Sequence, residues 1–520
     1  MSWKNEVEEI GQRQALAEQL GGEQAVERQH GRGRQTIRER IDALVDPDSF
    51  QEVGKLTGSA RYEAGKLQGL TPAPYVMGLA SIDGRAVAVG GEDFTVRGGS
   101  SWGGDRRKGG QGGFVEDLAH EYRIPLVNLV DGAGGTVTSA RRRGHAVLPG
   151  VDGFERSVEL LGEVPVVSAV LGAAAGGPAA RAVLSHWSVM VRGNSQIFAA
   201  GPAVVRRSLG EQLDNETLGG AAVAVDQAGT IDDAMDSEAE CLAAVRRFLS
   251  YLPDNVWQAP PVTEAVDPVT RAEESLLSIV PRERRRVYDM RKLMGLVLDE
   301  GSVFELCRSH GRGVITALAR IGGLPVGVVA NNPAHYGGAM DVSAAMKQAH
   351  FVDLCDTFHL PLLFLVDVPG FMVGSKAEQA GTLRAGVRAV MAGAQARVPV
   401  VTVIVRKCYG MAGMATCNKN GLNLKIAWPS AEWGSLPVEG GVAVAYAREI
   451  REAPDPKARE QELEAELREF SSPFRTAEAF GIEDIIDPRQ TRQYVHRFIA
   501  AAQSRILTSL GPSLRAGVRP

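Results

Sequence analysis

One block of sequence occurs twice in this chain. Residues 124–135 read IPLVNLVDGAGG and residues 360–371 read LPLLFLVDVPGF, so that Asp131 aligns with Asp367, 236 residues later. Each block is an apolar run that ends in a glycine loop. Solenoid and propeller repeats recur every ~20–50 residues, and the period here is several times longer. The chain is therefore expected to contain two copies of one domain.

A second pair of segments keeps nearly the same spacing. Residues 164–177 read VPVVSAVLGAAAGG and residues 398–411 read VPVVTVIVRKCYGM, and a third pair reads ASIDG and ARIGG. Between the copies, residues 250–271 are rich in proline and polar residues, which is typical of a linker. We therefore predict two domains of ordinary size, residues 1–260 and 261–520.

Short apolar runs that end in glycines are typical of buried parallel strands that lead into exposed loops. Residues 344–359 have a helical pattern, which suggests strand–helix units with ligands beyond the carboxyl ends of the strands. Glycine lets backbone N–H groups approach a ligand, and two such groups on one carbonyl oxygen form an oxyanion hole. Tight turns or close helix packing would also explain a single glycine loop. The duplication favours one oxyanion hole in each half.

Several segments are specific to a known family. They are His30–Phe50 (HGRGRQTIRERIDALVDPDSF), Asp93–Ser100 (DFTVRGGS), Phe364–Gly386 (FLVDVPGFMVGSKAEQAGTLRAG), and VPVVTVIVRKCYGMAG followed by NLKIAWPSAEWG. With these segments the chain resembles the carboxyltransferase (β) subunits of biotin-dependent acyl-CoA carboxylases, which include propionyl-CoA and methylcrotonyl-CoA carboxylases. The resemblance covers nearly the whole chain. It implies an α/β fold built as a tandem duplication of crotonase-like (ClpP/crotonase) ββα-superhelix domains.

The resemblance also implies a role for each half. In this family one oxyanion hole holds the thioester carbonyl of the acyl-CoA, here in the N-terminal domain, and the other holds the ureido carbonyl of carboxybiotin, here in the C-terminal domain. The implied catalytic residues are Gly134, Gly135, Gly176, Gly177, Gly410, Met411 and Ala412, and the implied biotin contacts are Gly370, Phe371 and Tyr409. Biotin is expected on a separate carrier protein or subunit, with a biotin carboxylase as partner. The family further implies a homo-oligomer, a hexamer.

The residue content agrees with carboxyl transfer. No cluster of paired acids, histidine-rich metal spacing or Ser-His-Asp arrangement is evident, so neither a hydrolase nor a metal site is expected. Carboxybiotin that releases carbon dioxide in a dry pocket can itself remove the α-proton of the acyl-CoA, and the enolate then attacks the carbon dioxide. The protein would supply two oxyanion holes and positioning.

Two other motifs resemble those of different functions. Residues 99–103, GSSWG, fit the nucleophile elbow of hydrolases, but they continue into a long stretch of glycine and charge. Ala345-Met346-Lys347 resembles the core of a biotin-attachment site, but it lies in a helical pattern, so Lys347 is expected to be a solvated helix lysine. Because the chain has no G-x-x-x-x-G-K-[ST] loop, it is expected not to carboxylate biotin itself.

Basic residues near the predicted loops are candidates for binding the phosphates of CoA. They are Arg32 and Arg34 in the family-like N-terminal segment, and Arg141, Arg142 and Arg143 after the first glycine loop. Charge-assisted hydrogen bonds would raise affinity for phosphate at such places. For each arginine, a solvated surface charge is the alternative.

Composition limits the remaining classes of function. The formal net charge of −5 does not suggest a nucleic-acid-binding protein. The five cysteines form no close pair, and the charged N-terminal segment has no signal-peptide core, so a cytoplasmic protein without a membrane span is expected. Cys408 and Cys417 flank the predicted biotin loop, where structural thiols are expected.

Two loops depart from the propionyl-CoA type of the family. Residues 131–140 read DGAGGTVTSA where that type has D-S-G-G-A-R-I-Q-E-G, and residues 409–416 read YGMAGMAT where it has Y-G-G-A-Y-D-V-M. Met414 thereby stands in place of an aspartate that influences acyl choice, and its thioether presents a flexible apolar surface. The substrate is expected to differ from propionyl-CoA and to carry a bulkier acyl group.

Two alternatives to a carboxylase stay open. A decarboxylase or transcarboxylase would run the same half-reaction with another carrier. A catalytically silent paralogue would serve only as an architectural subunit, which the altered loops make conceivable. Backbone donors survive changes of side chain, and this favours an active enzyme.

Overall fold

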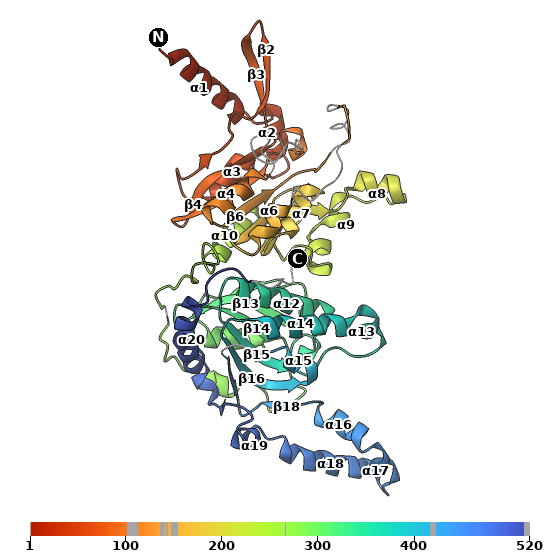
Figure 1. Ribbon diagram of the computed structural model, residues 1–520. Coiled ribbons are helices and arrows are strands. Elements are labelled where there is room, and N and C mark those ends of the chain that lie inside the picture. Colours follow the sequence, from red (N-terminus) through yellow and green to blue (C-terminus); the bar gives the residue numbers. More distant parts are fainter. Residues whose placement is uncertain are drawn as a thin grey trace. The chain divides into compact units, whose positions relative to one another are not determined.

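The chain divides into two compact units in the computed structural model. Unit 1 comprises Met1–Gln258 with Gly511–Ser513, and unit 2 comprises Ala259–Leu510. The structure describes residues 2–100, 113–135, 141, 144–146, 154–265, 267–416 and 423–513. Figure 1 labels many of the elements of both units. The assignment of acyl-CoA to the first half and biotin to the second stays a prediction.

A seven-stranded sheet forms the centre of unit 1, in the order β1-β4-β5-β6-β7-β9-β11. These strands are β1 (Gln51–Glu52), β4 (Tyr75–Ile82), β5 (Arg85–Glu92), β6 (Leu126–Val130), β7 (Val166–Val170), β9 (Trp187–Val191) and β11 (Asp233–Met235). β1 and β5 run antiparallel to β4, and the strands from β5 to β11 are parallel. Every residue of β6, β7 and β9 is buried, as expected for parallel strands that are covered on both faces.

Helices cover both faces of the unit 1 sheet. A methyl group on Gly91 of β5 would lie 2.5 Å from Cδ1 of Ile37 in α3, whereas Ala88 on the opposite face of β5 packs with Val115 of α4. The helices are α1 (Lys4–Glu18), α2 (Glu23–His30), α3 (Ile37–Leu44), α4 (Phe114–Tyr122), α6 (Glu155–Leu160), α7 (Gly177–Val183), α8 (Pro202–Leu209), α9 (Asn215–Gly219) and α10 (Glu238–Leu249), with η1 (Arg97–Gly99) and η2 (Ala222–Gln227). Two small sheets pair β2 (Gly58–Glu63) with β3 (Lys66–Pro72), and β8 (Ala173–Ala175) with β10 (Gln196–Phe198).

The sheet of unit 2 repeats this order of strands. Its path is β12-β13-β14-β15-β16-β17-β19, and β18 pairs with β16 beside that path. The strands are β12 (Phe304–Leu306), β13 (Val314–Ile321), β14 (Leu324–Asn331), β15 (Leu362–Val368), β16 (Val400–Tyr409), β17 (Asn423–Ala427), β18 (Glu432–Gly434) and β19 (Asp484–Ile485). As in unit 1, the first pairings are antiparallel and the later ones parallel.

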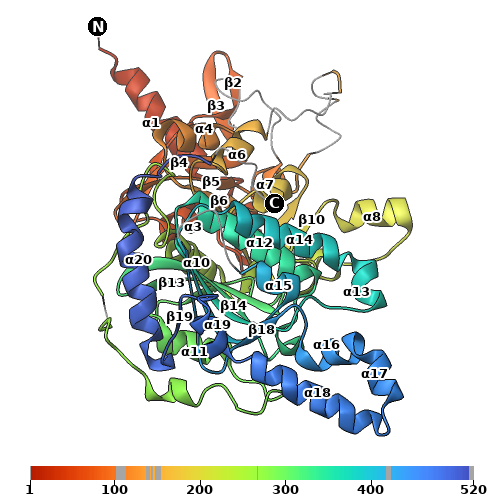
Figure 2. The ribbon, with the colours of Figure 1, turned by 60° about the horizontal axis from the view of Figure 1, so that its bottom comes forward.

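Helices also cover both faces of the unit 2 sheet. Ile499 of α20 shares a core with Val328 of β14, while a methyl group on Gly327 would meet Phe351 and Cys355 of α12 on the other face; Figures 1 and 2 show α12 and α20 on either side of the sheet. The helices are α11 (Met290–Val297), α12 (Val342–Thr357), α13 (Ser375–Ala380), α14 (Thr382–Gln395), α15 (Gly410–Met414), α16 (Val438–Ala445), α17 (Ala447–Glu452), α18 (Pro456–Phe470), α19 (Pro473–Glu478) and α20 (Thr491–Leu507), with η3 (Glu274–Leu277), η4 (Tyr336–Gly338) and η5 (Pro488–Gln490). In the described part of the chain, no helix is long and apolar enough to span a membrane.

The duplication extends to individual hydrogen bonds. Asp46 accepts the backbone N–H groups of Asp83 and Gly84 at 3.0 and 2.8 Å, at the turn between β4 and β5. Asp299 does the same at the turn between β13 and β14, 2.8 Å from both N–H groups. The short repeat of ASIDG and ARIGG therefore corresponds to the same hydrogen-bonding geometry in both units.

A buried charge cluster ties the sheet of unit 1 to two of its helices. The capping box of Thr36 starts α3 and points Arg40 inward, where 1% of its surface is exposed. Arg40 pairs with Asp131 at 3.0 Å and with Glu238 of α10 at 2.7 Å, and it donates to the carbonyl oxygen of Leu171 at 2.8 Å. Asp131 directly follows β6, so the cluster fixes the start of the first glycine loop.

Replacing Arg40 with methionine is expected to lower the free energy of unfolding by about 3–5 kcal/mol, because two buried carboxylates lose their counter-charge. Urea denaturation measures the change. Arg448→Met provides the matched control, since Arg448 and its partner Glu452 are 82% and 60% exposed, and the effect there should stay below about 1 kcal/mol. Equal shifts for the two variants would show that the buried cluster is not needed for stability.

Candidate active site

The two glycine loops of unit 1 meet beyond the ends of β6 and β7. A methyl group on Gly134 would lie 3.7 Å from Cα of Gly176 and 2.5 Å from the carbonyl oxygen of Ala175. Both glycines have left-handed backbones, with φ of 77° and 61°, a conformation that glycine adopts without strain. The structure thus brings together two residues that lie 42 positions apart in the sequence.

The backbone N–H groups of these loops are available to a ligand. α7 begins at Gly177, and the first N–H groups of a helix have no partner within the helix. Within the described residues, no hydrogen bond uses the N–H groups of Gly134, Gly176 or Gly177. A side chain on Gly135 or Gly177 would meet no atom within 4 Å, so both positions are open. This arrangement suits a single acceptor oxygen.

A buried ion pair holds α7 against the sheet. Arg181 of α7 pairs with Glu92 at the end of β5, and Arg181 also lies 5.4 Å from the centre of the Tyr75 ring. The second carboxylate oxygen of Glu92 accepts the N–H of Asp131 at 3.3 Å. Burial raises the pKa of Glu92, while the charge of Arg181 opposes this rise. The pair therefore positions both glycine loops relative to one another.

The equivalent loops of unit 2 leave β15 and β16. Val368 and Cys408 are partners in the parallel register, so Gly370 and Gly410 each lie two residues beyond a paired position. φ is 144° at Gly370 and 56° at Gly410. Within the described residues, no hydrogen bond uses the N–H groups of Gly410 or Met411, so unit 2 also presents unengaged donors at a strand end.

A second buried aspartate lies beneath these loops. Asp367 is fully buried and accepts from Arg406, 2.9 Å away, and from the N–H of Lys407 at 3.2 Å. The N–H of Asp367 in turn donates to Asn331 at 3.1 Å, as that of Asp131 donates to Glu92 in unit 1. Burial lowers the pKa of Lys407. The two halves therefore share an aspartate but take its arginine from different elements.

The predicted biotin contacts differ in exposure. Phe371 is partly exposed and its ring packs against Gly386, where an added methyl group would lie 2.7 Å away. Tyr409 is buried, and burial, with a contribution from the charge of Glu432, raises its pKa to about 12. Ala412 is buried, whereas Met411 and Met414 are 40% and 60% exposed. Tyr409 thus supports α15 from within the fold.

Charged side chains brace the loop that faces Gly410. The carbonyl oxygen of Ser435 lies 3.3 Å from a methyl group placed on Gly410. Arg284 pairs with Glu432 on one side of this loop and with Glu439, 2.6 Å away, on the other. The loop and its bracing were not predicted, because the three charged residues lie far apart in the sequence and carry no motif.

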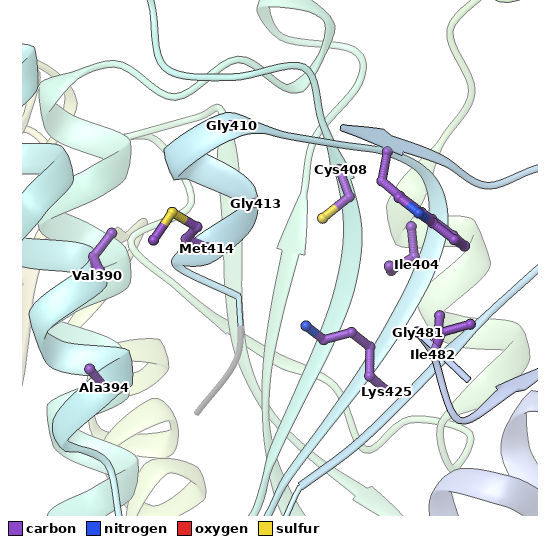
Figure 3. Close-up of a pocket in the computed structure, with 11 residues that line it drawn as sticks. Val390, Ala394, Ile404, Cys408, Gly410, Gly413, Met414, Lys425, Gly481 and Ile482 are labelled. Atoms are coloured by element: carbon purple, nitrogen blue, oxygen red, sulfur yellow. The ribbon is translucent and has the colours of Figure 1, made fainter. Parts of the chain in front are cut away.

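A cavity of about 480 Å³ opens beside Gly410 in unit 2. It is lined by Val390, Ala394, Ile404, Cys408, Gly410, Gly413, Met414, Lys425, Trp433, Gly481 and Ile482. Figure 3 shows the Lys425 amino group and the Cys408 sulfur pointing into the same space. Gly410 and Met414 were predicted site residues. Lys425 was missed, although a lysine inside the apolar strand segment NLKIAW was a signal for it.

The predicted CoA-binding arginines separate into two groups. Arg34 is 9% exposed and donates to the side chain of Asn194 at 2.9 Å and to its backbone carbonyl. Arg32 is exposed and lies 5.8 Å from the ring centre of Phe94, and Arg141 is also exposed. Among these three, Arg32 and Arg141 are accessible to a phosphate, and Arg34 is engaged within the protein. Residues 142 and 143 lie outside the described residues.

The prediction of a solvated Lys347 was wrong. Lys347 is 7% exposed, and its Nζ donates to the carbonyl oxygens of Cys307, His310 and Val314 at 2.7, 3.1 and 2.8 Å. The lysine lies on the side of α12 that packs against the sheet. Three carbonyl oxygens there take the place of water around its ammonium group. Such a lysine is not accessible for biotin attachment.

Two further expectations concern motifs. Within the described ranges, no group of three or more histidine, cysteine, aspartate or glutamate side chains could hold a metal ion. Residues 101–103 of the GSSWG motif and Cys417 lie outside the described residues. Cys408 lines the cavity described above, whereas Cys241 and Cys355 are buried.

Comparisons with known proteins agree with this geometry. The family model of the carboxyl transferase domain matches residues 28–514. The carboxyltransferase subunit of propionyl-CoA carboxylase from Haloferax mediterranei is 36% identical over 496 residues, 95% of each chain. The methylmalonyl-CoA decarboxylase subunit alpha of Veillonella parvula is 32% identical, over 96% of each chain.

A solved structure extends the comparison to the fold. The transcarboxylase 12S subunit, crystallised as a hexamer with methylmalonyl-CoA and methylmalonic acid, has a TM-score of 0.88 and 30% identity, covering 99% of this chain and 97% of its own. Fold and site together define a crotonase-like enzyme with duplicated halves. The chain belongs to the carboxyl transferase domain family. The predicted family, fold class and carboxyltransferase activity are confirmed.

Proposed function

We propose that this chain is the carboxyltransferase subunit of a biotin-dependent acyl-CoA carboxylase. It would move a carboxyl group from carboxybiotin on a separate carrier to the α carbon, or the vinylogous γ carbon, of an acyl-CoA. The observation that carries this proposal is the pair of loops that meet at Gly134 and Gly176, whose N–H groups make no hydrogen bond with any described residue. A thioester oxygen that gains negative charge during enolate formation needs such donors.

Unit 2 has residues that fit the biotin ring. Within the described residues, the N–H groups of Gly410 and Met411 make no hydrogen bond, which suits a ureido carbonyl. Phe371, on the loop that follows β15, presents a partly exposed aromatic ring. Bound carboxybiotin supplies the carboxyl group and, after its loss, a base. The protein would bind and orient both carbonyl groups through these backbone donors.

Two alternatives share this geometry. The decarboxylase subunit of Veillonella parvula shows that the family includes enzymes of that kind, and the same loops would serve a decarboxylase. A silent paralogue is disfavoured because the unengaged donors and the buried pairs beneath them are all present. The carboxylase proposal rests on the greater similarity to propionyl-CoA carboxylase subunits.

We also propose a cytoplasmic homo-oligomer, a hexamer. The transcarboxylase 12S subunit was solved as a hexamer, and this chain exposes an apolar stripe that an assembly could cover. Leu383, Val387 and Met391 lie four residues apart on α14, and they are 59%, 46% and 43% exposed. Residues at this spacing share one face of a helix.

Partner dependence provides the first test. Purified alone, the chain should fix no bicarbonate, and it should do so once a biotin carboxylase, a biotinylated carrier, ATP and an acyl-CoA are added. Incorporation of labelled bicarbonate into acyl-CoA measures this activity, and streptavidin blotting detects biotin on the chain itself. Intrinsic biotin on Lys347, or ATP-dependent carboxylation by the chain alone, would contradict the proposal.

Gly176→Val and Gly410→Val should each reduce turnover by ~10²–10³, the effect of one lost oxyanion donor, because a branched side chain blocks close approach to the N–H groups. Gly65→Val and Gly381→Val are matched controls, since all four glycines have positive φ and both control sites are open. Turnover is measured by steady-state kinetics on variants that fold and keep the oligomeric size of the wild type. Near wild-type turnover in both loop variants would refute the two oxyanion holes.

Met414 is 60% exposed and lines the cavity beside Gly410. In the proposed oligomer the N-terminal half of one chain faces the C-terminal half of another, and Met414 would there contact the acyl group. Met414→Asp should lower kcat/KM for long or branched acyl-CoA substrates and spare short ones, because a carboxylate against hydrocarbon loses hydration. One methylene is worth about 1–3 kcal/mol, so the ranking of substrates should change measurably. Acetyl-, propionyl-, butyryl- and isovaleryl-CoA are compared, with Met414→Leu as the apolar control. An unchanged ranking would remove Met414 from specificity.

A further inference from the structure

The cavity beside Gly410 combines an apolar wall with a single cation. Its volume of about 480 Å³ lies within the usual range of ~300–1,000 Å³ for sites that bind small molecules. The larger apolar residues of its lining are Val390, Ile404, Met414, Trp433 and Ile482. Among the described residues that line it, Lys425 alone carries a charge. An apolar ligand body is therefore accommodated by most of the wall.

Lys425 is held in place by the sheet. It belongs to β17 and pairs with Thr402 of β16 in the parallel register, between strand residues on either side. Its N–H donates to the Glu483 carboxylate at 3.1 Å, so that acid is engaged with the backbone of the lysine. Figure 3 shows the side chain reaching from the strand into the cavity. The backbone of this lysine is thus fixed by the sheet, and its side chain forms part of the cavity wall.

The ammonium of Lys425 forms no ion pair within the described part of the chain. No ion pair or hydrogen bond there involves its Nζ, and no aspartate or glutamate is among the cavity-lining residues. A cation that faces apolar surface loses hydration, and an anion placed beside it recovers much of that loss. The missing partner is most simply a group carried by a ligand.

We propose that this cavity binds an apolar chain that ends in a carboxylate, and that Lys425 pairs with the carboxylate. The chain has two possible sources with the same chemistry. It is either the acyl group of a substrate whose far end carries a second carboxylate, or a free fatty carboxylate that acts as an effector. Because Gly410 and Met414 line the same cavity, either ligand would lie beside α15 and its N–H groups. The substrate version rests on the proposed carboxyltransferase function.

Calorimetric titration of the full chain with octanoate and with octanol tests the binding site without any partner protein. Wild type should bind octanoate at least about tenfold more tightly than octanol, the size of a charge-assisted pair. Lys425→Met should lose that difference while octanol binding stays unchanged, and Lys425→Arg should retain most of it. Equal binding of the two ligands by wild type, or full octanoate affinity in Lys425→Met, would overturn the proposal.

Chemical labelling locates the ligand. Cys408 lines the cavity, and Cys307 is a comparably exposed cysteine that is not among the lining residues. Octanoate should slow the alkylation of Cys408 by iodoacetamide, read by peptide mass spectrometry, and leave the rate at Cys307 unchanged. Equal protection of both cysteines, or of neither, would place the ligand elsewhere and overturn the assignment.

Turnover with the biotinylated carrier distinguishes the two sources. Adipoyl-CoA and hexanoyl-CoA differ by a terminal carboxylate, so a substrate role predicts that Lys425→Met lowers kcat/KM for adipoyl-CoA alone, by about tenfold or more. An effector role predicts instead that octanoate changes hexanoyl-CoA turnover in wild type and has no effect in Lys425→Met. Absence of all carboxylation would contradict the proposed function, while the binding and labelling results would still decide the cavity.

Discussion

A buried aspartate at the end of a parallel strand is the constraint on which each half of this protein depends. Asp131 and Asp367 are both fully buried, and each has an arginine as counter-charge. A buried carboxylate without that partner would be strongly unfavourable, so the arginine and the strand end are held in one geometry. The glycine loops start within a few residues of these aspartates and inherit their position.

Each half neutralises its buried aspartate with an arginine, and the two arginines come from different kinds of element. Arg40 reaches Asp131 from α3, outside the sheet, whereas Arg406 reaches Asp367 from the neighbouring strand β16. When the sequences of the two halves are aligned, the two aspartates therefore match, whereas the two arginines lie at different positions and do not. Unit 2 also has a second set of charges, on Arg284, Glu432 and Glu439, which brace the loop opposite Gly410.

The sequence predicted those features of the fold and the site that depend on local residue chemistry and on the order of the strands. The meeting of Gly134 and Gly176 followed from two adjacent parallel strands that both end in glycine, and α12 followed from its periodicity. Lys347 was misjudged because helical spacing alone does not say which face packs on the sheet, and α12 has most of its residues buried. Arg181 was missed because its partner Glu92 comes from another element, and Lys425 was missed because the rest of the cavity wall comes from distant parts of the chain.

The oxyanion donors proposed at the paired glycine loops belong to the backbone, so the chemical step and the acyl preference would depend on different parts of the same loops. The altered letters of DGAGGTVTSA and YGMAGMAT lie on the same loops as the donors, yet a side-chain substitution there leaves the N–H groups in place as long as the glycines remain. Substrate range can therefore drift by point mutation while the chemical step is inherited unchanged. A scaffold of this kind is suited to gene duplication, since each copy can acquire a new acyl preference without first rebuilding a catalytic residue.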